Sequence, residues 1–512
     1  MADRSNGPAL GRWLAFATSL VILALLARRF LHNTDDLFIN LRYGYFIGEG
    51  WGPIFNSGER VEGYTAALWV TLLALFHALG VDLLKAGRLL SFLGGLCSVA
   101  LLWPLTLQWR WRGSALALLL LATTTSFAVW TSAAMDMTAY TALLLAALVV
   151  VGARRWAWAG IVLALATMMR PEGAMWTLLI LGYALVARRG EEVGARWRGP
   201  AFAFALWLVP TLLHIAFRLV YYGYPLPNTF YVKAALSTEV IGRGLHYLGD
   251  AAFDYRWSLT PALLLALLTP ATWRRHGALL WLLIAAQLAY AMIIGGDWMT
   301  SYRFLIPTLP LIAVQIARAL AAWTRPLPNP QRSYALLGTV MVGLLLLTAT
   351  QLQPKLARDP FFTQPWVPDG KEMAELIGVH CQPGTSIAVF AAGSLPYYLL
   401  PADFHIVDMF GLTTVEIAHA PNSYIGGIMP GHGRFSAETT RQLDPDLYIF
   451  HAEFDATAIT DETGWRVGGL SHLIQQFTDD PAFWSGRSTR TLEVAPGEYF
   501  NFVQKHDAAC SW

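Results

Sequence analysis

The sequence predicts a polytopic α-helical membrane protein that carries a soluble α/β domain at its C-terminal end. The chain of 512 residues is 55% hydrophobic and only 14% charged, with a mean hydropathy of +0.44, whereas soluble proteins carry about a quarter charged residues. Apolar stretches long enough, or nearly long enough, to span a bilayer recur up to about residue 351. Beyond that point the composition becomes mixed, with short apolar runs between polar stretches.

The first apolar segment follows a short basic leader, and no small-residue cleavage pattern precedes the polar stretch after it. We therefore expect an uncleaved first span and a cytoplasmic N-terminus. About eleven transmembrane helices are expected in all. Their predicted ranges are 13–30, 88–107, 114–131, 138–151, 156–169, 173–186, 201–220, 259–272, 278–294, 304–323 and 334–350.

One more apolar segment, 66–79, would make twelve spans, and the charges of the later loops decide against it. If it is left out, the arginine-bearing loops lie inside, as the positive-inside rule requires, and Arg28 and Arg29 are the exception. The arginines concerned are Arg110, Arg112, Arg154, Arg155, Arg188, Arg189, Arg196, Arg198, Arg274, Arg275, Arg325 and Arg332. We therefore expect residues 66–79 to form an interfacial helix in the first outer loop.

This topology gathers the polar connections and the C-terminal region on the outer side of the membrane. The formal net charge is only +2, from 36 basic and 34 acidic residues, and without a long basic run no nucleic-acid partner is expected. The run "AAGSLPYY" lacks the spacing of a dinucleotide-binding loop. Cys381 and Cys510 could pair in an oxidising compartment or remain free thiols.

Two adjacent aspartates, Asp35 and Asp36, follow the first span directly. If a helix begins at Thr34, Asp36 and Asn40 share one face of it. Carboxylates in the first turn also stabilise a helix through its macrodipole and a threonine cap. The aspartates are therefore either reactive groups or helix-start residues.

The glycine-rich loop that follows, "GWGPIFNSGERVEGYT", is typical of loops that hold a site on a rigid scaffold. It contributes Asn56, Glu59, Arg60 and Glu62 as candidate substrate-binding residues.

Two short turns between apolar spans carry further charges. Asp136 lies in "SAAMDMTAY" without a basic neighbour in the sequence, and the alternative is a solvated turn residue. Arg170 and Glu172 lie in "MMRPEG", where the alternative is a proline turn with its own ion pair.

The segment "YYGYPLPNTFYVKA" contributes Asn228 and Lys233, and "GGDWMTSYRFLIP" contributes Asp297 and Arg303. A cation at a membrane boundary often only reaches toward the headgroups. A cationic pair at the outer lipid boundary is also what a lipid-linked phosphate needs.

These stretches resemble the GT-C class of membrane glycosyltransferases, which use polyprenyl-phosphate sugars, and more narrowly the mycobacterial terminal β-arabinofuranosyltransferase family. The matching runs are "DDLFINLRY", "GWGPIFNSGERVEGYT", "MRPEG", "YYGYPLPNTFYVKA", "GGDWMTSYRFLIP" and "IVDMFGLTTVEIAHA". The resemblance implies a bacterial inner-membrane enzyme of GT-C type that transfers a sugar, arabinofuranose in the closer relatives, to a cell-envelope glycan or lipid.

The resemblance also implies that an acidic residue of the first outer loop acts at the reaction centre, which here is Asp35 or Asp36. Relatives carry a glutamate in the turn where this chain has Asp136, which leaves the role of that carboxylate open. The reaction must deprotonate an acceptor hydroxyl and stabilise a departing phosphate. We therefore assign Asp36, with Asp35 as its neighbour, to the role of base or of orienting the acceptor, and Lys233 and Arg303 to the phosphate.

We expect Glu172 and Asp297 to position these groups. The adjacent aspartates could instead hold a divalent cation. The expected partners are the polyprenyl-phosphate sugar, the acceptor and membrane lipid.

We predict two domains, a transmembrane glycosyltransferase domain over 1–352 and an extracytoplasmic α/β domain over 353–512. Strands are expected at "SIAVF", "FHIVDMF", "DLYIF" and "YFNFVQK", in a domain that recognises the acceptor, covers the site or serves only as a cap. The main rival function is a polytopic transporter, although transporters concentrate ionisable groups near the bilayer midplane. A catalytically silent sugar-binding protein is the third alternative.

Overall fold

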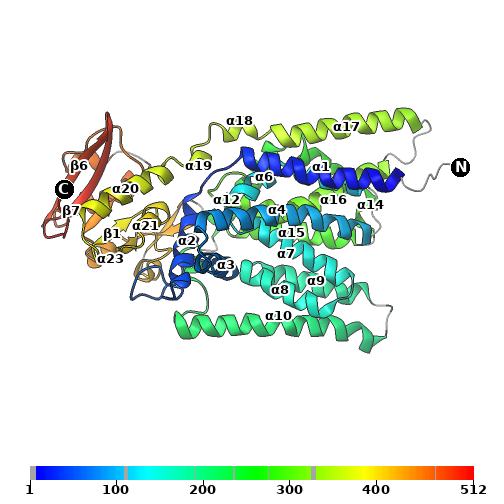
Figure 1. Ribbon diagram of the computed structural model, residues 1–512, viewed down its shortest axis with the longest axis horizontal. Helices are drawn as coiled ribbons and strands as arrows, with labels where there is room; N and C mark the ends of the chain where they lie inside the picture. The colour runs from blue at the N-terminus through cyan, green and yellow to red at the C-terminus, as the bar shows by residue number, and fades with distance from the viewer. Residues whose placement is uncertain are drawn as a thin grey trace.

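The computed structural model describes residues 7–512 apart from residues 109–112, 189, 191, 234–236, 275, 324–329, 422, 430 and 467–468. Helices occupy most of the chain to about residue 350, and a mixed sheet follows. Helix α1 (Gly7–Arg29) begins at the end of the helical bundle opposite the sheet (Figure 1). Outside the described residues lie Arg110, Arg112, Arg189, Arg275 and Arg325, which contributed to the predicted topology.

Among the described residues, four helices are long and apolar enough to cross a membrane. They are α1 (Gly7–Arg29), α4 (Leu83–Gln108), α10 (Val193–Tyr221), and η1 (Arg303–Thr308) continued by α16 (Leu309–Trp323). The bent pair α5 (Ser114–Thr123) and α6 (Thr125–Ser132) makes a fifth if it is one span.

The other apolar helices have 10 to 17 residues, fewer than the roughly 20 of a typical span. They are α3 (Ala67–Ala78), α7 (Met137–Gly152), α8 (Trp156–Met169), α9 (Gly173–Ala187), α13 (Leu259–Leu268) and α15 (Gly277–Ile293). Further helices in this part are α11 (Asn228–Lys233), α12 (Thr238–Asp254), α14 (Pro270–Trp273) and α17 (Pro330–Thr350). The predicted number of about eleven spans therefore stays a prediction.

The break between α5 and α6 is a bend of 62° at Thr124, which leaves the helical conformation. Threonine hydroxyls satisfy backbone carbonyls there: Thr124 Oγ1 donates to Leu120 O at 2.7 Å, and Thr125 Oγ1 donates to Thr348 O of α17 at 2.9 Å. Few backbone groups are therefore left without a hydrogen bond at the bend, as an apolar environment requires. It directs α6 toward the sheet end of the bundle (Figure 1).

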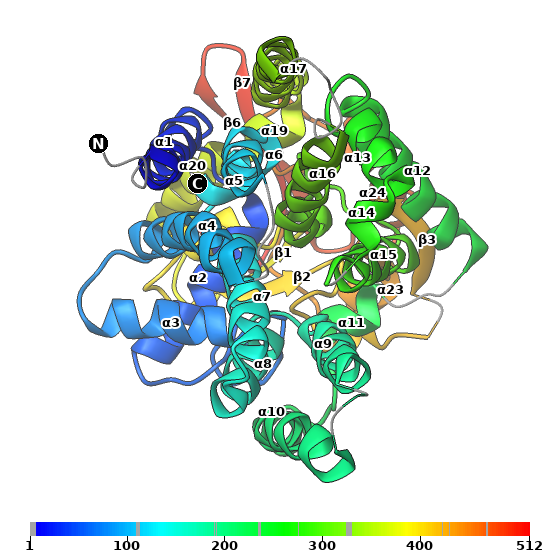
Figure 2. The same ribbon diagram turned by 90° about the vertical axis from the view of Figure 1, so that its right-hand side faces the viewer.

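The segment between α1 and α4 contains α2 (Asp35–Gly48) and α3. Figure 2 shows α3 side-on, whereas the long helices are seen nearly end-on, so α3 lies across the bundle. The two helices pack closely, since a Cβ at Gly44 would lie 2.9 Å from Leu73 Cβ. With 12 residues and an exposed Leu75, α3 has the form expected of an interfacial helix, and its place at a membrane surface stays a prediction.

The C-terminal part contains a five-stranded sheet in the order β2-β1-β5-β7-β6. Its strands are β1 (Ser386–Val389), β2 (His405–Asp408), β5 (Leu447–Ile449), β6 (Arg487–Ala495) and β7 (Glu498–Lys505). β1 is parallel to β2 and β5, whereas β7 is antiparallel to β5 and β6. β3 (Tyr424–Met429) and β4 (His432–Arg434) form a separate hairpin. The four expected runs thus contain β2, β1, β5 and most of β7.

Helices and aromatic side chains cover both faces of this sheet. Residues Met373 and Ile377 of α20 (Trp366–His380) pack on one face, and Phe477 of α24 (Ser471–Thr478) packs on the other. The remaining short helices are α18 (Gln353–Leu356), α19 (Pro360–Thr363), α21 (Ser394–Tyr398), α22 (Val415–Ala418), α23 (Ala437–Gln442) and η2 (Glu462–Arg466). A disulfide joins Cys381 to Cys510, which resolves the pairing that the sequence left open.

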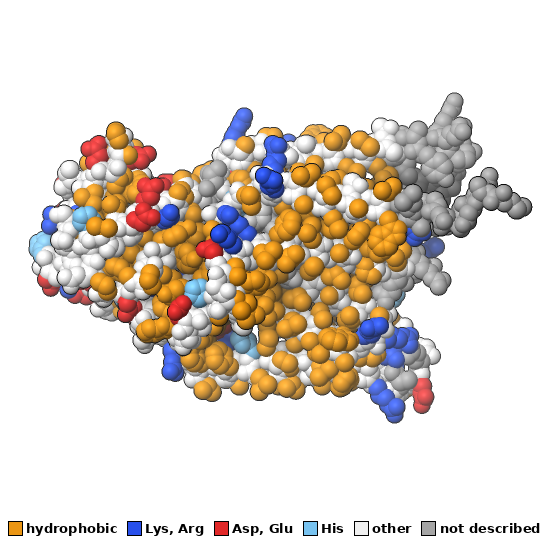
Figure 3. Space-filling model, viewed as in Figure 1, with side chains coloured by type: hydrophobic (Ala, Val, Ile, Leu, Met, Phe, Trp, Pro, Cys, Tyr) orange, Lys and Arg blue, Asp and Glu red, His pale blue; other side chains and the backbone are white. Residues whose placement is uncertain are grey.

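The surface agrees with a membrane-embedded bundle. Hydrophobic side chains cover the bundle in Figure 3, and most of the visible acidic side chains lie over the sheet end. Large apolar side chains are exposed on α10, among them Val209, Leu213 and Val220. Such a surface would be costly in water and is normal in lipid.

Candidate active site

The two adjacent aspartates at the start of α2 point to different partners. The carboxylate of Asp35 accepts the backbone N–H groups of Gly393 at 3.0 Å and Ser394 at 2.8 Å, both in the C-terminal part. Oδ2 of Asp36 lies 3.6 Å from Nη1 of Arg303. Thr34 does not cap the helix, because its hydroxyl donates to Met135 Sδ at 3.3 Å. The aspartates therefore do more than stabilise a helix start.

Arg303 is held by Asp297 in a two-pronged contact. Its Nε lies 2.7 Å from Asp297 Oδ2, and its Nη2 donates to Asp297 Oδ1 at 2.9 Å. The guanidinium also lies over the rings of Phe304 and Trp130, at 5.1 Å and 5.9 Å. A planar guanidinium fixed in this way keeps one edge directed at Asp36.

The backbone before Arg303 is strained. Ser301 and Tyr302 have φ values of 61° and 57°, in the left-handed region that non-glycine residues rarely adopt. Trp130 Nε1 donates to Ser301 O at 3.0 Å, and the Tyr302 hydroxyl bonds to Asp254. Strain held by such contacts is common where a side chain must be aimed at a site.

Lys233 ends α11 and completes the cluster. Its side chain is exposed to solvent, and among the described residues no hydrogen bond or ion pair engages its ammonium. Desolvation by the surrounding protein lowers the pKa of Lys233, and the attraction of Asp36 opposes this shift. The charges of Asp36, Arg303 and Asp297 also act on the ammonium, so Lys233 belongs to the same cluster. The hairpin β3–β4 lies beside Lys233, since a Cβ at Gly431 would lie 3.8 Å from Nζ.

A second buried charge group lies beside the first. Arg170 Nη1 is 3.0 Å from Asp136 Oδ2, and its Nε is 2.5 Å from Glu172 Oε1. Its guanidinium lies 5.5 Å from the centre of the Phe304 ring, the ring that Arg303 also contacts. The local ion pair considered for this turn is thus present, and Asp136 has a basic partner from a distant turn rather than being solvated.

The glycine-rich loop makes structural contacts with the C-terminal part. Asn56 pairs with the backbone of Ile406 on the edge strand β2, donating to its oxygen at 2.8 Å and accepting its N–H at 3.0 Å. It also donates to Glu59 Oε2 at 3.0 Å, and Glu59 lies 3.3 Å from His405. Asn56 and Glu59 therefore join two parts of the chain, outside the cluster of Asp36, Lys233 and Arg303.

The remaining candidates of this loop also bind other parts of the protein. Glu62 forms a buried ion pair with Arg218 at 2.8 Å, and burial raises the pKa of Glu62 to about 7. Arg60 lies over the Tyr221 ring at 4.6 Å. Asn228 donates to Gly411 O at 2.7 Å, again in the C-terminal part.

The sequence interpretation missed three residues that hold α2, the glycine-rich loop and their partners together. Arg42 of α2 donates to the backbone oxygens of Phe55, Pro396 and Phe404. Arg218 was included in an apolar span, although an arginine at the end of such a span is a usable signal. Gly393 lies in the run "AAGSLPYY", where a glycine after a strand was noted only as an unmatched dinucleotide motif.

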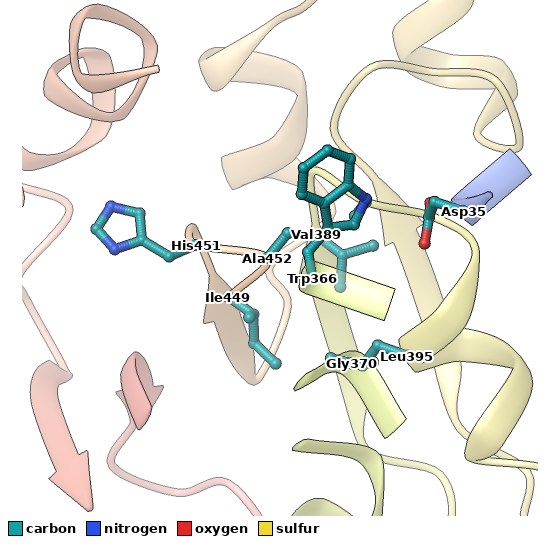
Figure 4. A pocket seen from close by; sticks show the side chains of 9 residues that line it. Asp35, Trp366, Gly370, Val389, Leu395, Ile449, His451 and Ala452 are labelled. Atoms are coloured by element: carbon teal, nitrogen blue, oxygen red, sulfur yellow. The ribbon is translucent and has the colours of Figure 1, made fainter. Parts of the chain in front are cut away.

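A small cavity lies between Asp35 and the carboxyl ends of β1 and β5. Figure 4 shows Asp35 on one side of it, Trp366 between, and His451 on the far side. Its volume of about 10 Å³ is room for at most one water molecule. The cavity is therefore no substrate pocket.

Comparisons with known proteins bear on this arrangement. The terminal beta-(1->2)-arabinofuranosyltransferase of Corynebacterium glutamicum is 28% identical over 342 residues, which cover 54% of this chain and 47% of that protein. ArnT from Cupriavidus metallidurans superimposes with a TM-score of 0.58 at 16% identity, over 99% of this chain and 100% of that one. The chain has the GT-C glycosyltransferase fold.

A third relative agrees with this assignment. The arabinofuranosyltransferase AftD from Mycobacteria matches with a TM-score of 0.53 and 15% identity over 98% of this chain and 40% of its own length. A family model described as a domain of unknown function (DUF8728) matches residues 358–495. The GT-C resemblance of the sequence motifs is thus confirmed, and the chain spans less than half the length of the curated relative.

Proposed function

We propose that this GT-C protein transfers a sugar, arabinofuranose in the first instance, from a polyprenyl phosphate to a cell-envelope glycan or lipid. The observation that carries the proposal is the carboxylate of Asp36 facing Arg303, with the Lys233 ammonium close enough to be attracted by Asp36. The similarity to the arabinofuranosyltransferase of Corynebacterium glutamicum supports the sugar. ArnT, which shares the fold, has been solved with undecaprenyl phosphate, and this supports the lipid.

Lys233 and Arg303 are assigned to the donor phosphate. The sugar leaves on a phosphate whose negative charge grows as the glycosidic bond breaks, so fixed cations stabilise the transition state more than the ground state. Asp297 holds Arg303 and leaves an edge of its guanidinium free of that contact. Burial lowers the pKa of Lys233, and a bound phosphate would favour its charged form.

Asp36 is assigned to the acceptor. Its side chain is 21% exposed, and the 3.6 Å separation from Arg303 is longer than a hydrogen bond, so its oxygens can accept a proton from an acceptor hydroxyl. The opposite charge of Arg303 keeps this carboxylate close to the cations that take the phosphate. One residue thus faces the nucleophile while its neighbours face the leaving group.

We assign a supporting role to Arg170, Asp136 and Glu172, which hold the position of Arg303. They are buried and bound to one another, and Arg170 touches the same Phe304 ring as Arg303. We assign no contact with substrate to Asn56, Glu59, Arg60, Glu62 and Asn228, because their side chains bind other parts of the chain.

The carboxylates of Asp35 and Asp36 do not point toward a common ion position, because that of Asp35 binds the backbone N–H groups of Gly393 and Ser394. In the described part of the chain, no three His, Cys, Asp or Glu side chains are grouped to hold a metal ion. We therefore propose that the charge of the phosphate is met by Lys233 and Arg303 rather than by a cation between Asp35 and Asp36.

The remaining proposals concern topology. We propose about eleven spans, a cytoplasmic N-terminus, and a boundary near residue 352 between the membrane domain and an extracytoplasmic C-terminal domain in the bacterial inner membrane. The start of α1 and the sheet lie at opposite ends of the bundle, which supports this arrangement (Figure 1). The contacts of the C-terminal part with α2 and α11 support a task in acceptor recognition.

The deciding experiment measures transfer of radiolabelled sugar from synthetic polyprenyl-phosphate donors by the purified protein, with arabinofuranose tested first. Asp36→Asn should abolish transfer while the protein stays folded, with a loss of about 100-fold or more. Asp461→Asn is the matched control, because Asp461 is an exposed carboxylate of the C-terminal part. No transfer from a broad donor panel, or solute flux instead, would contradict the proposal.

A further inference from the structure

The start of α2 is fastened to the C-terminal part at one residue. The two oxygens of Asp35 accept the N–H groups of Gly393 and Ser394, and the N–H of Asp35 donates to Gln364 Oε1 at 2.8 Å. Asp35 is 7% exposed. Both its backbone and its side chain are therefore engaged by residues more than 300 positions away.

The contact admits only glycine at position 393. A Cβ there would lie 2.0 Å from the backbone oxygen of Asp35 and 2.6 Å from its carboxylate carbon. The Ser394 hydroxyl donates to Val367 O of α20 at 2.5 Å, which ties the loop to the sheet's covering helix. The loop after β1 is thus shaped to receive this aspartate.

A second contact lies two turns further along the same helix. Arg42 donates to Pro396 O of α21 and to Phe55 O. Residues seven apart share a helix face, so Asp35 and Arg42 present one face of α2 to α21. The next residue, Asp36, is turned by about 100° from that face, and it faces Arg303.

We propose that Asp35 is a positioning residue, which fixes the rotation of α2 against the C-terminal part so that Asp36 faces Arg303. The inference rests on the proposed role of Asp36 in sugar transfer. The two adjacent aspartates then have different tasks: Asp36 contacts substrate, whereas Asp35 binds other residues of the protein. The C-terminal part then takes part in catalysis through the loop of Gly393 and Ser394.

The kinetic test compares Asp35→Asn, Gly393→Ala and Asp36→Asn. The first two should lower kcat roughly 10- to 100-fold with little change in the KM for the donor, because misplacing a catalytic group by about 1 Å has this effect. Asp36→Asn should remove transfer. If Asp35→Asn abolishes transfer like Asp36→Asn while Gly393→Ala keeps the wild-type kcat, Asp35 acts on substrate and the proposal is wrong.

A second measurement does not depend on activity and needs only Asp35→Asn. Amide hydrogen exchange should become faster at Gly393 and Ser394 and in the first turn of α2. Asp461→Asn is the matched control, because Asp461 also accepts two backbone N–H groups, from Thr463 and Gly464, but away from α2. Unchanged exchange at Gly393 and Ser394 overturns the positioning role, whereas a wild-type protein without transfer overturns the proposed function.

Discussion

Nη1 of Arg303 lies 3.6 Å from Oδ2 of Asp36, while Asp297 binds the same guanidinium in two places. The arginine is therefore oriented by one carboxylate and directed at another. Because only a planar, forked cation can make both contacts, the geometry depends on arginine and not merely on a positive charge.

Arg303→Lys should lower transfer while the charge is kept. Lysine loses the second contact to Asp297 and its fixed direction, and a charge-assisted hydrogen bond contributes about 1.5 to 3 kcal/mol. We expect kcat/KM for the lipid donor to fall roughly 10- to 100-fold. Initial rates at varied donor concentration measure this.

The matched control is Arg256→Lys. Arg256 is an exposed arginine after α12, and its guanidinium lies over the Phe253 ring at 3.9 Å, a ring outside the cluster of Asp36, Lys233 and Arg303. Its replacement should leave kcat/KM unchanged. An Arg303→Lys enzyme with wild-type kinetics would show that charge alone suffices.

Asn56→Ala should destabilise the protein rather than weaken substrate binding. The change leaves the N–H and the oxygen of Ile406 without partners at a buried strand edge, and each such group costs about 1 to 3 kcal/mol. We expect a lower Tm by thermal fluorimetry, with unchanged donor KM in the folded fraction. Gln442→Ala, which removes an exposed amide, is the control, and a raised KM without a change in Tm would contradict the assignment.

Composition and hydropathy predict the helical bundle, and alternation of apolar runs predicts four strands of the C-terminal sheet. The charges Asp36, Lys233, Asp297 and Arg303 could also be selected as a group, because the topology predicted from the loop charges puts all four on one side of the membrane. Their geometry could not be predicted, since it depends on the strained backbone at Ser301 and Tyr302.

Local sequence patterns do not predict which distant residue each side chain contacts. Asn56 looks like a loop amide, and its partner is an edge strand 350 positions later. Successive residues of an α-helix are rotated by about 100° around its axis, so Asp35 and Asp36 point in different directions. Which of them faces Lys233 and Arg303 depends on how α2 packs against α21. Such contacts are decided by tertiary packing between distant segments.

Removal of divalent cations should leave transfer unchanged. Asp35 is engaged by Gly393 and Ser394, so the aspartate pair offers one carboxylate rather than a converging set of oxygens, while Mg²⁺ and Ca²⁺ need several. Transfer measured with excess EDTA should match transfer with added Mg²⁺. Activity that disappears with EDTA and returns with Mg²⁺ would show that a cation takes part.

The stability of the protein should depend on Asp35 in a defined pH window. Burial raises the pKa of Asp35 from 3.8 to about 7, against the backbone hydrogen bonds that lower it. The folded state then binds this proton more tightly than the unfolded state, so the contribution of Asp35 to stability is complete below about pH 4 and declines until about pH 7. Asp35→Asn cannot titrate, so its Tm relative to wild type should rise across that window, and Asp461→Asn should not reproduce the trend. A constant difference in Tm between wild type and Asp35→Asn from pH 4 to pH 7 would show that the carboxyl group does not change its protonation on folding.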